Sequence, residues 1–161
     1  MLCASLVTTP ALAEVSWHVD ATAIDEHNRA AVIAQAGSRQ GDQVRVFRRP
    51  DGGVILSLRL RPGFERLAGD GCPTLTVLGS EPPLAVALGA CRLDARGFEA
   101  TLGFIRDSTL ASGAVSALMQ GESMHLTLRL ERVGYRHISM SLRGSRIALR
   151  KMLGTNVQVV R

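Results

Sequence analysis

The stretch "SMHLTLRLERVGYRHISMSLRGS", residues 123–145, decides the fold because apolar and polar residues alternate along most of it. In the first half the apolar side chains are Met124, Leu126, Leu128 and Leu130. In the second half they are Ile138, Met140 and Leu142. Successive side chains of a β-strand point to opposite faces, so the pattern predicts two strands, each with one face in the core and one in water.

These two strands are expected to form an antiparallel hairpin, Met124–Arg132 with His137–Arg143. Inward residues must face inward residues, and Gly134 can adopt positive φ in a five-residue loop spanning 132–136. This register has the following opposed pairs: Glu131 and His137, Arg129 and Ser139, Thr127 and Ser141, His125 and Arg143.

The polar side chains of the predicted hairpin form a candidate binding face. Its members are His125, Thr127, Arg129, Ser139, Ser141 and Arg143. Guanidinium groups and hydroxyls donate the hydrogen bonds that an anionic ligand or a protein partner requires. The alternative is a solvated face without a ligand, since antiparallel sheets commonly have one side in water.

Further strands are expected upstream of this hairpin. Two alternating segments flank the turn Pro50-Asp51-Gly52-Gly53, and residues 73–94 contain two more strands broken by Glu81-Pro82-Pro83. Residues 97–105 predict another strand. Residues 30–36 are expected to form a strand, with a short helix as the alternative.

Two segments change to the three- and four-residue spacing of a helix. Residues 108–120 have Ser108 as the expected N-cap, and residues 145–153 have Ser145 in that role and Gly154 as the stop. Residues 155–161 predict a terminal strand. The expected fold is therefore mostly β, an antiparallel β-sandwich or flattened barrel with two short helices.

The first residues predict export. Ala11-Leu12-Ala13 follows Pro10 and matches a signal-peptidase site, so residues 1–13 are interpreted as the remnant of a signal peptide. The alternative is an ordinary, slightly apolar N-terminus. Residues 14–161 are then a single domain in the periplasm or outside the cell, and no other stretch is long enough to span a membrane.

The cysteines agree with export. Cys3 lies in the predicted signal peptide, which leaves Cys72 and Cys91 to form a disulfide in an oxidising compartment. The alternative is two buried thiols. No metal site or cofactor is predicted, because C-x-x-C is missing and the four histidines show no ligand spacing.

Composition and motifs exclude several function classes. The net charge is +5, but the 18 arginines and one lysine are dispersed and aromatic residues make up 4%, which argues against nucleic-acid binding. The chain has no G-x-S-x-G elbow, H-E-x-x-H helix or phosphate loop. A non-enzymatic protein is expected, with an envelope hydrolase assembled from distant residues as the alternative.

Residues 114–152 resemble the C-terminal part of the invasion-associated locus B family of exported proteobacterial proteins. The shared pattern is a helix, Gly121, two strands that run into Ser141-Leu142-Arg143-Gly144, and a short helix at Ile147-Ala148-Leu149. Accessory exported proteins of type VI secretion clusters look similar and share the opening Trp17-His18-Val19. The resemblance implies a non-enzymatic periplasmic or secreted β-domain whose partner is an envelope or host protein.

Overall fold

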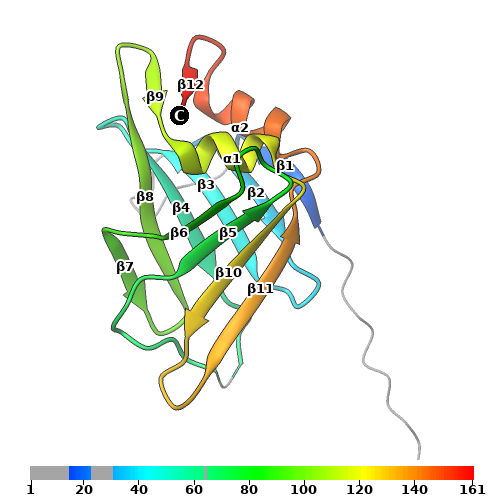
Figure 1. The fold of residues 1–161 in the computed structure, drawn as a ribbon, viewed down its shortest axis with the longest axis vertical. Helices are drawn as coiled ribbons and strands as arrows, with labels where there is room; N and C mark the ends of the chain where they lie inside the picture. The colour runs from blue at the N-terminus through cyan, green and yellow to red at the C-terminus, as the bar shows by residue number, and fades with distance from the viewer. Residues whose placement is uncertain (1–14, 23–30, 64) are drawn as a thin grey trace, which may run out of the picture.

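The computed structural model describes residues 15–22, 31–63 and 65–161, which form two β-sheets and two helices (Figure 1). The larger sheet has the order β1 (Val15–Asp20), β2 (Ile33–Gly37), β3 (Gln43–Arg48), β4 (Gly53–Arg59), β8 (Gly97–Arg106), β9 (Thr109–Ala111) and β12 (Gln158–Val160), and β7 (Cys91–Asp94) also pairs with β8. The smaller sheet has the order β11 (Tyr135–Ser141), β10 (Ser123–Arg129), β5 (Thr74–Leu78) and β6 (Leu84–Ala87). The predicted class, mostly β with two helices, is confirmed.

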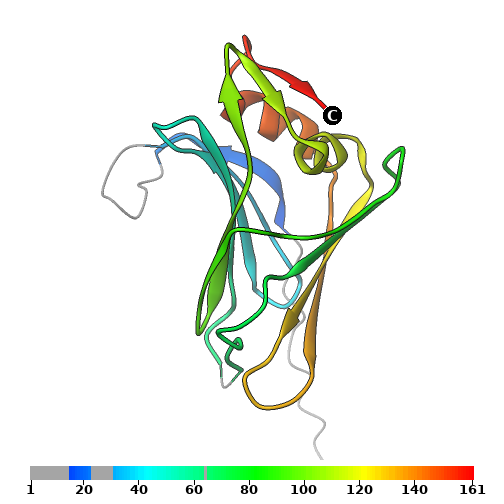
Figure 2. The same ribbon diagram turned by 60° about the vertical axis from the view of Figure 1, so that its left-hand side comes forward.

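The core lies between the two sheets, which face one another while α1 (Gly113–Gln120) and α2 (Ser145–Leu153) lie at one end (Figure 2). Most inward positions of both sheets are apolar and buried, as Leu58 on β4 and Leu126 on β10 illustrate. Helix α2 packs on β1, β2, β3 and α1. The alternation in the sequence therefore reflects one shared core.

The first helix is shorter than predicted, because residues 109–111 form strand β9. Asp107 and Ser108 have φ values of 46° and 59°, so they form a tight turn and Ser108 is not an N-cap. The cap is Ser112, whose Oγ accepts the Val115 N–H at 3.2 Å. A short apolar run fits both the two-residue period of a strand and the 3.6-residue period of a helix. The predicted helix therefore begins too early, at residue 108.

The second helix has the predicted bounds but a different N-cap. Gly144, with φ of 86°, precedes the helix, and the Ser145 hydroxyl instead donates to the Leu118 carbonyl oxygen at 2.7 Å. Ser145 thus joins α2 to α1. Gly154 ends the helix with φ of 98°, as predicted.

The predicted hairpin register is wrong. The loop lies two residues earlier than predicted, so each residue of β10 pairs with a β11 residue four positions before the predicted one. The structure pairs His125 with Ser139, Thr127 with His137 and Arg129 with Tyr135. The loop is residues 130–134, five residues as expected, with Gly134 at φ of 98°. Both registers keep apolar residues inside, so the choice depends on a contact that the pattern cannot contain: a bridge pairs Leu130 with Leu67 and holds the end of β10 there.

The predicted turn at 50–53, the strand at β2 and the terminal β12 are confirmed. Residues 73–94 form three strands instead of the expected two, because the chain leaves the smaller sheet after β6 and joins the larger sheet as β7. Cys72 and Cys91 form the predicted disulfide, with their Cα atoms 5.7 Å apart. It links the segment before β5 in the smaller sheet to the start of β7 in the larger one. The predicted signal peptide, residues 1–13, lies outside the described residues. None of the described helices is long and apolar enough to cross a membrane.

Candidate binding groove beside strand β11

Strand β11 is an edge strand, since it pairs with β10 on one side only. The Leu142 N–H donates to the Glu122 carbonyl oxygen, which fixes the phase of the antiparallel ladder: even-numbered residues of β11 bond to β10. The backbone N–H and C=O groups of the odd-numbered residues, among them His137 and Ser139, therefore point away from β10. No described residue bonds to these groups of His137 or Ser139.

A groove of about 440 Å³ lies beside this edge. Strand β11 and the start of β10 form one side, and the turn between β2 and β3 forms the other. The lining residues are Ser38, Arg39, Gln40, Glu122, Ser123, His137, Ser139, Met140 and Ser141. The volume is within the range of small-ligand sites, and every lining residue except Met140 is polar or charged.

The end of β11 beside the groove is held by Trp17 on β1. Its indole N–H donates to the Ser141 carbonyl oxygen at 3.0 Å, and its side chain is buried. This bond attaches the end of β11 to the larger sheet. It also uses the carbonyl group that would otherwise continue the open edge.

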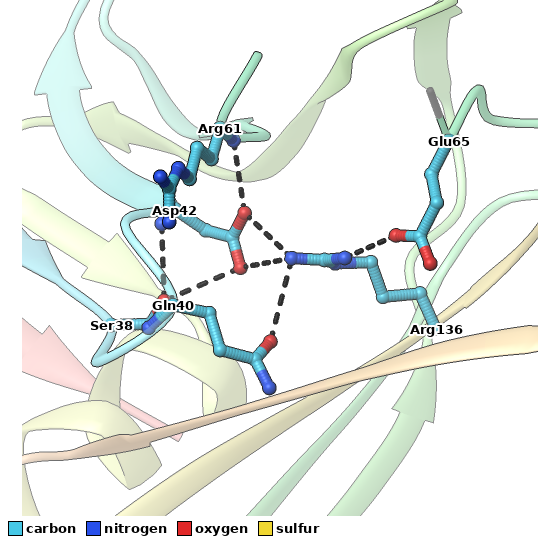
Figure 3. Close-up of polar contacts among 6 residues, drawn as sticks. All are labelled: Ser38, Gln40, Asp42, Arg61, Glu65 and Arg136. Carbon is cyan, nitrogen blue, oxygen red and sulfur yellow. Dashed lines mark hydrogen bonds and ion pairs between the residues drawn. The ribbon is translucent and has the colours of Figure 1, made fainter. Parts of the chain in front are cut away.

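Six residues, of which Ser38 and Gln40 line the groove, form a polar cluster, here called the Asp42–Arg136 cluster: Ser38, Gln40, Asp42, Arg61, Glu65 and Arg136 (Figure 3). Asp42 is completely buried. Its carboxylate accepts hydrogen bonds from Arg136 Nη2 at 2.9 and 3.0 Å, from the Arg61 N–H at 3.0 Å and from Ser38 Oγ at 3.3 Å. A buried carboxylate needs such partners, and here three separate segments supply them.

Arg136 connects this carboxylate to the exposed rim. One nitrogen, Nη1, bonds to Glu65, and Nη2 also reaches the Gln40 side-chain oxygen at 3.4 Å. Burial by itself would lower the pKa of Arg136, but the hydrogen bonds and charges of Asp42 and Glu65 raise it above its ordinary value. Arg136 is thus a permanent cation that holds β11 against the β2–β3 turn.

A second cavity, of about 380 Å³, lies on the other side of the same cluster. Its lining residues are Gln40, Leu60, Arg61, Pro62, Gly63, Glu65 and Arg136. Gln40 lines both cavities. The cluster therefore separates the two hollows and supports the wall of each.

The predicted binding face is only partly brought together. Ser139 and Ser141 line the groove, while His125 and Thr127 lie beside it on the outer face of β10. Arg129 forms an ion pair with Asp70 at 2.8 Å between exposed side chains.

Arg143 lies beyond the far end of β11. Since Arg129 is opposite Tyr135, Arg143 is eight residues further along, about 27 Å in an extended chain. The two arginines therefore do not converge on one ligand. Whether the face binds a partner stays a prediction.

Two histidines of this face contact hydroxyl groups. Ser123 Oγ lies 3.3 Å from His125 Nε2, and Thr127 Oγ1 lies 3.2 Å from His137 Nδ1. A nucleophile and its base are also arranged as a hydroxyl beside an imidazole, but such sites add a group that orients the imidazole. Among the described residues, no carboxylate contacts either ring, and no three potential metal ligands cluster together.

Sequence reasoning missed the Asp42–Arg136 cluster. A signal was present: Arg136 precedes Ile138 and Met140 by two and four residues, so it occupies an inward position of the same strand. A charged residue at a core position indicates a buried partner. The predicted register obscured this by placing Arg136 in the loop.

Comparisons with protein-family models, with curated proteins and with solved structures found no match for this chain. The features of the described residues that bear on function are the groove, the cluster and the disulfide. Each of these is defined by named side chains and can be changed by substitution.

Proposed function

We propose that this chain is an exported, non-enzymatic accessory domain that binds a protein partner in the cell envelope or at a host cell. The observation that carries the proposal is the groove between the edge strand β11 and the β2–β3 turn. Both sides of the groove are held by the buried pair of Asp42 and Arg136. Preformed sites on rigid strands bind with a small entropic cost.

Export is supported by two independent features. The Cys72–Cys91 disulfide is typical of proteins in oxidising compartments, and it links the two sheets. The signal-peptidase pattern at residues 11–13 belongs to the same route. The resemblance to the invasion-associated locus B family favours a role in the envelope or in host interaction.

The test is site-specific crosslinking in the native cell envelope. A photoreactive amino acid at Ser139, in the groove, is expected to trap one partner that mass spectrometry identifies. The matched control places the same group at Ala85 on β6, the opposite edge of the same sheet. Equal capture at both positions, or no capture at Ser139, would overturn the proposal.

The outer face of the hairpin is tested separately. If this face takes part in recognition, the combined substitution of Arg129→Ala and Arg143→Ala weakens partner capture without changing the unfolding midpoint, because both side chains are exposed. Unchanged capture would assign recognition to the groove without these arginines.

A hydrolase is the second candidate, and the pair of Ser123 and His125 at the groove rim is the observation that favours it. A fluorophosphonate probe would label an activated serine. Labelling that disappears in Ser123→Ala would establish this reading. An unlabelled, disulfide-bonded protein that still captures its partner would support the binding proposal instead.

A further inference from the structure

We propose that the groove binds one extended peptide segment of the partner, which pairs with β11 as an additional strand of the smaller sheet. This inference rests on the proposed function and names the form in which the partner is recognised. In such strand addition, main-chain hydrogen bonds supply affinity, and alternate side chains supply specificity.

The first observation is that β11 is the least protected edge among the described strands. It pairs with β10 at all seven of its residues without a register shift. By contrast, β1 has an irregularity between Val15 and His18, β6 and β7 have four residues each, and β12 has three. Short or bulged edges resist pairing with another chain, whereas a long regular edge invites it.

The second observation is the chemistry of this edge. The backbone groups of His137 and Ser139 point away from β10, and no described residue bonds to them. The segment 137–141 contains no proline, lysine or arginine that would block a new strand. The edge therefore presents donors and acceptors in the spacing of an extended backbone.

The third observation concerns the space beside the edge, which suits a single chain. Neighbouring strands lie about 4.8 Å apart, and across the groove from β11 stands the turn that contains Ser38, Arg39 and Gln40. A second copy of the protein that paired through its own β11 would have to bring its own β10 and its own β2–β3 turn against the facing turn. A peptide brings neither, so it is the occupant that fits.

The geometry also indicates the pattern of the peptide. Peptide side chains that lie beside Met140 would point to the inner side of the sheet, where Met140 itself lines the groove. Those beside Ser139 point to the polar outer side. The segment from His137 to Ser141 spans about 17 Å, so the expected ligand has about five residues with apolar and polar side chains in alternation.

The experiment uses a phage library of random heptapeptides, selected on the intact protein. Ser139→Pro removes the N–H that points to the open edge but no ladder bond, a position where strands tolerate proline. Ala85→Pro is the matched control: the bond from the Leu88 N–H to the Pro73 carbonyl oxygen fixes the phase of β6, so the Ala85 N–H points away from β5. Unfolding midpoints confirm that both variants are folded.

The expected result is a set of alternating peptides that bind the wild type and Ala85→Pro equally and bind Ser139→Pro at least tenfold more weakly. Ser139→Ala keeps the N–H and should bind as the wild type does. If Ser139→Pro does not fold, the selected peptide is N-methylated on its backbone instead. This removes the peptide N–H groups that would bond to β11 and should weaken binding in the same way. The proposal is overturned by peptides that ignore both changes, or by no enrichment on the wild type over the Ser139→Pro variant.

Failure of this inference can be told from failure of the proposed function. If the photoreactive group at Ser139 traps a partner whose binding survives Ser139→Pro, the domain binds a partner by its side chains and not by strand addition. If peptides bind the edge in vitro but nothing is trapped in the envelope, the strand addition stands and the accessory role fails.

Discussion

Arg136→Met is the substitution that most directly tests how the two sheets are held together. Methionine keeps an unbranched apolar stem of similar length but removes the guanidinium group. The Asp42 carboxylate, which is 0% exposed, then loses both bonds from Arg136 Nη2. It retains the Arg61 N–H and the Ser38 hydroxyl.

The magnitude follows from the burial of each partner. Removing one member of a buried ion pair costs about 3–5 kcal/mol, because the remaining charge is left unpaired in the interior. The two donors that remain on Asp42 place the expected loss near the lower end, about 3 kcal/mol. The bond to Glu65 adds at most about 1 kcal/mol, since the Glu65 side chain is 51% exposed.

The assay is urea unfolding of the disulfide-bonded protein, followed by the fluorescence of Trp17. At a slope of about 1–3 kcal/mol per molar urea, the midpoint should fall by about 1–3 M. Arg129→Met is the matched control. It removes another arginine of the same hairpin, one whose ion pair with Asp70 is exposed. That variant should lose less than about 1 kcal/mol.

A double-mutant cycle with Asp42→Asn separates the pair from its surroundings. The double variant should be less destabilised than the sum of the single variants, by about 1–3 kcal/mol. Additive losses, or equal losses in Arg136→Met and Arg129→Met, would refute the assignment of Arg136 as a buried tie between the sheets.

Three further outcomes are expected. Leu149→Ala on α2 truncates a fully buried side chain and should cost about 2–5 kcal/mol in denaturant unfolding; a loss below about 0.5 kcal/mol would mean that the helix is not docked. Thiol labelling of the unreduced, denatured mature protein should detect neither Cys72 nor Cys91, and reduction should cost about 3 kcal/mol. Burial by itself would raise the pKa of Asp94, but hydrogen bonds from the Arg96 N–H and from the Arg59 guanidinium, together with the charge of Arg59, lower the pKa below its ordinary value. The stability from Asp94 is thus present above its ordinary pKa and lost as the pH falls through the lowered value, so Asp94→Asn should flatten the unfolding midpoint against pH in that acid range.

Much of the fold could be predicted because burial repeats with the period of each element. The turn at 50–53 and the alternating residues on both sides of it specify β3 and β4 without any long-range information. The C-terminal helix is equally local, since its apolar stripe ends at a glycine that adopts positive φ.

The hairpin register and the cluster could not be predicted in this way. The observed pairing differs from the predicted pairing by four positions, and a shift by an even number leaves every side chain on its own face. The alternation of apolar and polar residues therefore cannot choose between the two registers. The choice depends on Leu67 and Asp42, which are about 60 and 90 residues away from their partners in sequence. Arg136 could have been recognised as inward only if the predicted second strand had begun before His137.

The open edge of β11 poses a physical problem that its surroundings resolve. An exposed, regular edge promotes pairing with other copies of the chain, and proteins normally block such edges. Here the β2–β3 turn stands beside the edge, fixed there by the bonds from Arg136 to Asp42 and Gln40. The turn stands where the edge of another sheet would have to approach, and between the turn and β11 lies the groove. The same buried ion pair that joins the two sheets therefore keeps the edge available to a peptide while protecting it from self-association.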